Sequence, residues 1–349
     1  MESNRKTVVD KIKIEPIPSS VYREKISDEV YFSKKYSGYI SNSRLKLINP
    51  DQNGSPSKYL KGFGNSTSPS LVLGSAVHEI FLQPEIFSMG PDLNKPTGKL
   101  GLVIDEFISI KNKENISIKN AIIKACKKVD YYTNSLNDNR IRAIIKAGLP
   151  YYLGRKKMSE GGKIFLPEKD MGIVTRCVEN LRSNKKVVNI IQPVDFFGER
   201  IDSYNEDAFF INFKCSYESK ECVIKFKMKA DNWTIDLENK IITLNDLKTT
   251  SSFACKFMEK SWINYHYSRQ FAGYLYVLLR YCEKEYGYNP EEWTFKCNVI
   301  VVETTADNRS VVFPITKEML KPGKEEFCRL LKMIAYCEMH EYSDDIEFL

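Results

Sequence analysis

Two acidic residues and a lysine lie on neighbouring predicted strands. Asp231 ends the segment KMKAD, and Asp246 and Lys248 lie within ITLNDLKTT. Because residues of equal parity face the same side of a strand, Asp246 and Lys248 project together, roughly 6.6–7 Å apart. Carboxylate oxygens are the ligands that Mg²⁺ prefers, and an ammonium group beside them can contact a phosphate or the attacking water. These residue types predict metal-assisted chemistry at a phosphate group.

A hairpin between the two strands would bring the acids together. The strand that contains Asp231 ends close to it, and the next strand begins after a turn near residues 237–239. Antiparallel pairing would then place Asp231 close to Asp246. The backbone carbonyl of Leu247 is a further candidate oxygen ligand, since it follows Asp246 directly. We therefore predict a metal site made by Asp231, Asp246 and this carbonyl.

The alternation of apolar and polar residues in the second strand argues against an exposed position for Asp246 and Lys248. An Asp-x-Lys on a strand usually belongs to an exposed face. Here, however, Asp246 and Lys248 are in phase with Ile242 and Leu244, which should face the core. A carboxylate and an ammonium group on a core-facing stripe are costly unless they are paired or bind a ligand.

A predicted helix after these strands adds two candidate residues. In the helix expected over 265–281, Gln270 and Tyr274 are four residues apart and share a face. Packing of aromatic residues against a core explains Tyr274 well and Gln270 poorly. We therefore expect Gln270 and Tyr274 to support the site.

The order of the predicted elements indicates a mixed α/β fold of the α+β kind. Residues 1–40 are expected to form an N-terminal arm, and 41–349 a single domain. Within that domain, helical patterns dominate up to about residue 197, including one over 71–87 that stops at Pro84. Strand patterns dominate 198–315, with one helix among them, and a closing helix follows over 317–340. The predicted strands are ERIDSY, AFFINFKCSY, CVIKFKMKADNW, KIITLNDLKTT, EWTFKCNVIVVET and SVVFPI.

Composition narrows the functional classes. Nine scattered cysteines without a C-x-x-C pair argue against a disulfide framework and against a zinc or iron–sulfur site. The net charge of +7 is compatible with a polyanionic partner. The first thirty residues contain no apolar run typical of a secretory signal, and no apolar run is long enough to cross a bilayer. We therefore expect no membrane association and a cytoplasmic location, which is the host cytosol if a phage encodes the protein.

Five segments in fixed order resemble a known family. They are ISNSRLKLI, LVLGSAVHEIFLQPEIF, KADNW, NDLKTT and RQFAGYLYV, and they are similar to the exonuclease VIII-like branch of the PDDEXK nuclease superfamily. Phages and prophages use these enzymes in recombination. The resemblance extends over most of residues 36–282, and it depends on the ordered set, since no single segment would suffice. It implies a restriction-endonuclease-like core with a central mixed sheet flanked by helices.

The resemblance assigns roles to individual residues. It implies that His78 lies near the metal, that Lys248 is the catalytic lysine, and that the metal-binding acids are Asp231 and Asp246. It also implies that Gln270 and Tyr274 support the site and contact DNA. Two departures remove no ligand: Ala230 stands where many members have proline, and the second acid is Asp where Glu is usual. Glu199 is a further possible acid.

The resemblance also implies an activity, a cofactor and partners. The expected enzyme is a Mg²⁺-dependent exonuclease, with Mn²⁺ as a substitute ion, that degrades linear double-stranded DNA from its ends. The expected direction is 5′ to 3′, which leaves a 3′ single strand for an annealing protein, and a homo-oligomer is expected. Ser43, Arg44 and Lys46 are candidate contacts for the terminal phosphate or the backbone, although surface solvation explains any one of them better.

Two alternatives remain open at this stage. One is a CRISPR-adaptation or helicase-associated nuclease of the same superfamily. Those relatives usually carry a four-cysteine iron–sulfur cluster, whereas Cys328 and Cys337 stand alone here. The other alternative is a non-catalytic module that binds DNA ends or proteins and retains the fold.

Overall fold

The chain divides into two compact units in its computed structural model. The structure describes residues 7–62, 68–84, 96–114, 116–160, 166, 168–305 and 307–346. One unit combines Met1–Pro84 with Glu168–Leu349, and the other comprises Glu85–Pro167. The sequence analysis expected one domain across 41–349. The difference arises because the second unit has an apolar core of its own.

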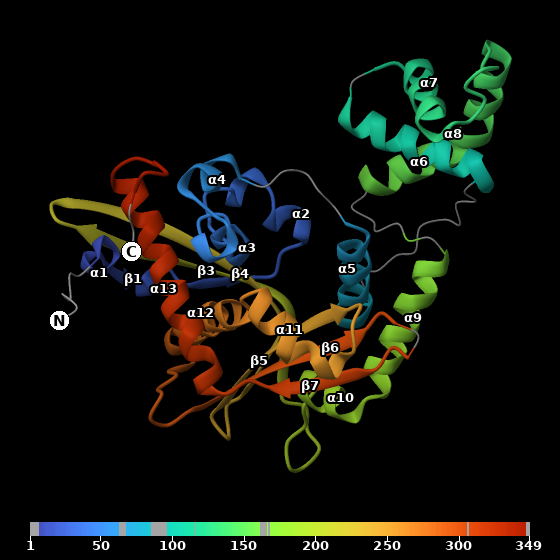
Figure 1. Ribbon diagram of the computed structural model, residues 1–349. Helices are drawn as coiled ribbons and strands as arrows, with labels where there is room; N and C mark the ends of the chain where they lie inside the picture. Colours follow the sequence, from blue (N-terminus) through green and yellow to red (C-terminus); the bar gives the residue numbers. More distant parts are fainter. Residues whose placement is uncertain are drawn as a thin grey trace. The chain divides into compact units, whose positions relative to one another are not determined.

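The first unit is built on a seven-stranded mixed sheet (Figure 1). Its strand order is β1-β3-β4-β5-β6-β7, with β2 also pairing to β3. Only the β5–β6 pair is parallel among these pairings, and the others are antiparallel. The strands are β1 (Lys13–Pro16), β2 (Tyr22–Glu24), β3 (Asp202–Tyr217), β4 (Lys220–Asp236), β5 (Ile241–Thr250), β6 (Thr294–Glu303) and β7 (Ser310–Pro314).

Helices flank this sheet. α12 and α13 pack together and contact β3 and β4, whereas α9 contacts β6 and β7, and α10 contacts β4 and β7. The α-helices of this unit are α1 (Val8–Lys11), α2 (Asp28–Tyr31), α3 (Asn42–Leu45), α4 (Pro56–Lys61), α5 (Pro69–Leu82), α9 (Glu168–Ser183), α10 (Lys185–Ile191), α11 (Phe257–Asn264), α12 (Tyr267–Tyr286) and α13 (Lys317–Met339). Short 3-10 helices occupy Pro18–Ser20, Lys34–Tyr36, Pro50–Gln52 and Ala254–Lys256. The predicted fold class, a mixed α/β fold with a central mixed sheet flanked by helices, is confirmed.

Buried aromatic side chains join the sheet to α12 and α13. Phe226 of β4 meets Phe327 of α13 edge to face, with ring centroids 5.0 Å apart. Trp233 is fully buried, and its ring stacks on Tyr204 with a centroid distance of 4.6 Å. Its indole N–H donates to Asp207 Oδ2 over 2.9 Å, so the polar atom of this core residue is satisfied. This packing gives the strands next to the site a rigid support.

The sheet departs from the sequence prediction on its outer side. The segments ERIDSY and AFFINFKCSY were expected as separate strands, but the single strand β3 runs through the second half of the first segment and all of the second. The predicted N-terminal arm is joined to the sheet, because β1 and β2 both pair with β3. The helix predicted over 71–87 corresponds to α5, and residues 85–87 lie outside the described residues.

The second unit contains three helices in its described residues. They are α6 (Gly98–Lys113), α7 (Ile118–Val129) and α8 (Asp138–Glu160). Val103, Ala121 and Cys126 are fully buried in its core. Among all the helices that the structure describes, none combines the length and the apolar character needed to cross a bilayer.

Candidate metal centre

Three carboxylates occupy equivalent positions on three adjacent strands. Asn205 of β3 pairs with Asn232 of β4, which in turn pairs with Asn245 of β5. Extended by one position, beyond the last pair of β4 with β5, the same register places Glu206, Asp231 and Asp246 at one level of the sheet. The β3–β4 pairing is interrupted at this level, where Glu206 has a φ of 55°. Such a backbone conformation is uncommon outside glycine and is frequent at functional sites. The sheet therefore gathers three acids across its width.

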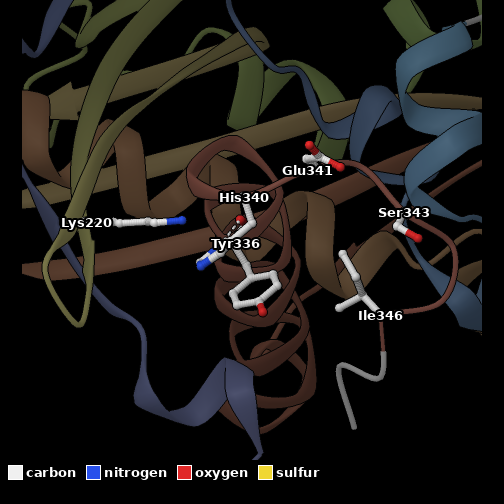
Figure 2. Close-up of a pocket in the computed structure, with 6 residues that line it drawn as sticks. All are labelled: Lys220, Tyr336, His340, Glu341, Ser343 and Ile346. Carbon is white, nitrogen blue, oxygen red and sulfur yellow. Dashed lines mark hydrogen bonds between the residues drawn. The ribbon is translucent and has the colours of Figure 1, made fainter.

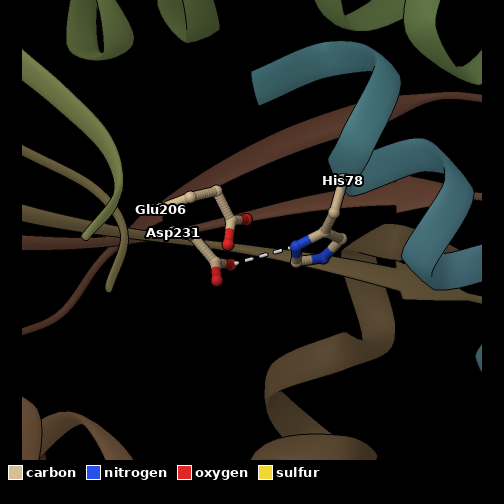
Figure 3. A group of neighbouring side chains, drawn as sticks. All are labelled: His78, Glu206 and Asp231. Atoms are coloured by element: carbon tan, nitrogen blue, oxygen red, sulfur yellow. Dashed lines mark ion pairs between the residues drawn. The ribbon is translucent and has the colours of Figure 1, made fainter. Parts of the chain in front are cut away.

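His78 completes a group with two of these acids. Its ligand atoms and those of Glu206 and Asp231 all lie within 4.8 Å of one another (Figure 3). The Nδ1 atom of His78 is 3.5 Å from Asp231 Oδ2. An imidazole nitrogen and two carboxylates form a donor set that suits a divalent cation such as Mn²⁺, and the two carboxylates suit Mg²⁺. Within the described ranges, no other group of three such side chains is this close together.

Helix α5 brings His78 to the sheet. The Oγ atom of Ser68 accepts the backbone N–H of Leu71 over 3.3 Å and caps its first turn. At Gly74 the helix approaches β5 closely, since a Cβ atom there would lie 3.0 Å from Thr249 Oγ1. The absence of a side chain at Gly74, one helical turn before His78, thus allows α5 to pack closely against β5.

Asp246 lies beside this group but has different partners. Its carboxylate forms an ion pair with Lys248, and its Oδ1 accepts an N–H of Gln270 Nε2 over 2.7 Å. Asp231 instead accepts the backbone N–H of Leu247 through Oδ2, over 2.7 Å. Residues of β4, β5 and α12 thus meet around the two predicted acids. Asp246 was expected to face the core, and it does, since only 3% of it is exposed.

Burial controls the protonation of these groups. It raises the pKa of Asp246 to about 6. The nearby Lys248 ammonium lowers this pKa but offsets only part of the effect of burial. Burial also raises the pKa of Asp231 and Glu206, and for Glu206 the charge of Asp231 adds to the effect. Burial lowers the pKa of His78, so its imidazole is neutral near neutral pH and can donate a lone pair to a cation. Crowded carboxylates of this kind are stabilised by a cation.

Lys248 remains an ammonium group in this setting. Burial alone would lower its pKa, but the carboxylates of Asp246 and Asp231 outweigh burial and raise it above the ordinary value. Its Nζ atom lies 5.3 Å from the ring centroid of Tyr267, a cation–π geometry. Tyr274 is near the same charges: burial, then Tyr31 and the carboxylates, raise its pKa well above the ordinary value.

A second lysine restrains Glu206 from its other side. Lys229 Nζ lies 2.9 Å from Glu206 Oε2 and also pairs with Asp28 of α2. Burial would lower the pKa of Lys229, but the Glu206 and Asp28 carboxylates raise it. The positive charges of Lys229 and Lys248 thus flank the acidic row at its two ends.

Some predicted residues do not join this group. Ser43 and Arg44 lie on α3, where Ser43 Oγ is 2.9 Å from Ser41 Oγ and the Arg44 guanidinium lies 4.7 Å from the ring centroid of Tyr59. Glu199 is exposed in the loop before β3, where its backbone N–H donates to Asp195 Oδ1 over 2.7 Å. The acid that β3 contributes is Glu206, which the sequence analysis did not single out.

We expect the metal-free protein to lose stability as the pH rises from about 4 to about 6. In this window native Asp246, with a pKa of about 6, holds a proton that the unfolded chain has released near its ordinary pKa of 3.8. This stabilising contribution is complete below the lower pKa and is lost through the higher one. Urea unfolding at stepped pH measures the slope. The variant Asp246→Asn should flatten it, and an unchanged slope would contradict the assignment.

A shallow pocket lies elsewhere on the first unit. It has a volume of about 410 Å³ and is lined by Lys220, Tyr336, His340, Glu341, Ser343 and Ile346 (Figure 2). The His340 Nδ1 atom is 3.0 Å from the Tyr336 carbonyl oxygen, so the ring is held against its own helix. None of the residues predicted to act at the site lines this pocket.

Comparisons with known proteins give no family assignment. The chain matches no model of a known protein family and no curated protein. Among solved structures, it is similar to a "putative exonuclease" from Eubacterium rectale with a TM-score of 0.44 and 10% identity, over 93% of this chain and 89% of that one. Rai1 of Scheffersomyces stipitis, in complex with (3′-NADP)⁺ and calcium ion, gives a TM-score of 0.23 and 10% identity, over 98% and 88%. At these scores, the functional argument depends on the geometry of the site.

Proposed function

We propose that this chain is a nuclease that hydrolyses phosphodiester bonds with a divalent cation. The observation that carries the proposal is the row of Glu206, Asp231 and Asp246 across three strands, with His78 above it and Lys248 beside it. Burying this many carboxylates without a cation is costly. Lys229 and Lys248 pair with Glu206 and Asp246, but the ligand atoms of His78, Glu206 and Asp231 still lie within 4.8 Å of one another, close enough to share one cation.

The donor set supports Mg²⁺ as the ion, with Mn²⁺ as a substitute. Asp231 is central, because its Oδ2 atom is fixed by the Leu247 N–H and lies next to His78. In this proposal Asp246 and the Leu247 carbonyl provide further oxygen ligands. When bound, the cation supplies Lewis-acid assistance and lowers the pKa of a coordinated water. His78 and Glu206 would hold it on the side of β3.

Lys248 has the charge and the position to act on the phosphate. Because it stays protonated beside Asp246, it can neutralise charge on a non-bridging oxygen or orient the attacking water, but it cannot accept a proton in this state. Gln270 holds Asp246 from α12, and this fixes the carboxylate that in turn fixes Lys248. The contacts thus run from Gln270 of α12 through Asp246 to Lys248, which would act on the phosphate.

The finer assignment is an exonuclease VIII-like DNA exonuclease of phage-type recombination. The order of the five sequence segments supports it, and so does the net charge of +7, which favours a polyanionic substrate. In this proposal the enzyme degrades linear duplex DNA from 5′ ends, leaves 3′ single strands for an annealing protein, and works as a homo-oligomer in the cytoplasm. Ser43 and Arg44 would contact the DNA backbone, and Tyr274 would support the site.

Digestion of end-labelled DNA tests the proposal. We expect linear duplex to be shortened in Mg²⁺ or Mn²⁺ with release of the 5′ label first, closed circular duplex to survive, and EDTA to stop the reaction. Release of the 3′ label first would contradict the direction but not the nuclease. Binding to DNA ends without cleavage in either ion would contradict the nuclease and favour the non-catalytic alternative.

A further inference from the structure

Four asparagines form a row across the sheet directly beside the acids. Asn205 pairs with Asn232, Asn232 with Asn245, and Asn245 with Asn298, so the row spans β3, β4, β5 and β6. Three of them are sequence neighbours of the carboxylates: Asn205 precedes Glu206, Asn232 follows Asp231, and Asn245 precedes Asp246. Asn232 and Asn245 are fully buried. We call these four residues the amide row.

The side chains of the amide row are hydrogen-bonded in one direction. Asn298 Nδ2 donates to Asn245 Oδ1 over 2.8 Å, and Asn245 Nδ2 donates to Asn232 Oδ1 over 2.7 Å. Asn232 Nδ2 then donates to Asn205 Oδ1 over 2.7 Å. Each inner amide is a donor on one side and an acceptor on the other. Bonds in such a chain polarise one another in a buried setting, so the chain stabilises one register of the four strands.

The chain of hydrogen bonds ends on the helix that carries His78. Asn205 Nδ2 donates to the backbone carbonyl of Leu82, the last residue of α5, over 2.8 Å. The last carbonyls of a helix have no partner within it, so this bond satisfies one of them. Leu82 lies four residues after His78, about one helical turn along the same side of α5. The position of this carbonyl therefore constrains the position of the imidazole.

Further hydrogen bonds join the amide row to α10 and to β3. Asn245 Nδ2 also donates to the Ile190 carbonyl of α10 over 2.9 Å, and Asn232 Nδ2 donates to Ser203 Oγ over 2.9 Å. On β5, Asn245 and Asp246 point to opposite faces, so the amide row does not contact a ligand at the acidic group. Its members can affect the site only through the backbone and α5.

We infer that the amide row is a positioning device for the metal centre. It fixes the register that lines up Glu206, Asp231 and Asp246, and it anchors the end of α5 so that His78 meets two of these acids. Leucines of similar size would fill the same space without the cost of burying amides, which argues for a role in specificity. The effect on metal affinity rests on the proposed function, whereas the anchoring of α5 does not.

Two variants and one control test this inference. Asn205→Leu removes the last link to α5 without adding charge, and Asn245→Leu breaks the row in its middle. Ile224→Ala, in the core of β4 away from the row, provides a matched loss of stability. We expect the α5 amides of Glu79–Leu82 in the metal-free asparagine variants to exchange hydrogen at least about tenfold faster than in the control. Their Mn²⁺ affinity, measured by titration of Mn²⁺ alone, should fall about tenfold.

The possible outcomes separate the inference from the proposed function. Exchange in α5 equal to that of Ile224→Ala would overturn the anchoring, and unchanged Mn²⁺ affinity would overturn the positioning of the ligands. If Asn245→Leu does not fold, Asn205→Leu, at the half-buried end of the row, still decides both. If the unaltered protein binds no Mn²⁺, the proposed function is contradicted, and the exchange of α5 alone decides the inference.

Discussion

Replacing Lys248 with methionine is expected to lower the rate of DNA hydrolysis by about a thousandfold, the usual cost of losing a group that stabilises transition-state charge. Lys248 is the ammonium group held at the acidic row, paired with Asp246 and kept protonated by Asp246 and Asp231. Methionine keeps the length of the side chain and removes the charge. Because Lys248 is not one of the clustered ligands, Mn²⁺ affinity should stay within a few fold, as measured by titration with the metal alone.

The matched control is Lys296→Met. Lys296 lies exposed on the neighbouring strand β6, so the same substitution there removes one positive charge without touching the site. We expect that variant to digest linear DNA at the rate of the unaltered protein. Full activity of Lys248→Met in Mg²⁺ would remove the central residue from the proposed mechanism.

Much of the sheet and part of the site could be predicted from alternation in the sequence. The period-two pattern of ITLNDLKTT places Asp246 and Lys248 on one side, and the turn before it makes a hairpin with the strand of Asp231. These are local signals, because they need only the backbone period and a turn. The contact between Gln270 and Asp246 joins residues far apart in the sequence. In the pattern of residues, its one sign was a polar side chain on a helix face expected to be apolar.

Glu206 was missed for a physical reason. The sequence Asn205-Glu206-Asp207 consists of poor strand formers, and it separates two apolar alternating segments like a loop. The strand continues through it because each side chain has a partner: Asn205 joins the amide row, Glu206 joins the acidic group, and Asp207 pairs with Arg23 over 2.9 Å. These partners come from distant segments, which a single sequence does not reveal.

The second unit could not be separated for a similar reason. Its helices have apolar faces like those of helices that pack on a sheet. Only the partners of those faces differ, since α6, α7 and α8 pack on one another. Periodicity predicts that a face is buried but carries no information on what buries it.

Replacing Asp231 with asparagine is expected to abolish metal binding and activity together. Asp231 lies next to both His78 and Glu206, so the loss of its charge weakens the whole donor set. An amide oxygen can still accept the Leu247 N–H, so the hairpin should keep its local hydrogen bond. We expect Mn²⁺ affinity to fall on the order of a hundredfold or more, and hydrolysis about a thousandfold, because a lost cation costs several kcal/mol of transition-state stabilisation.

The contrast between the two variants identifies the roles of the residues. Lys248→Met should lose hydrolysis and keep Mn²⁺ binding, whereas Asp231→Asn should lose both. The control for the aspartate is Asp236→Asn, the same substitution on the same strand at the turn, where the side chain accepts the Asn239 N–H over 2.9 Å. If Asp231→Asn bound Mn²⁺ as tightly as Asp236→Asn does, the acidic row would be a structural network, and its register with the amide row would serve only the fold.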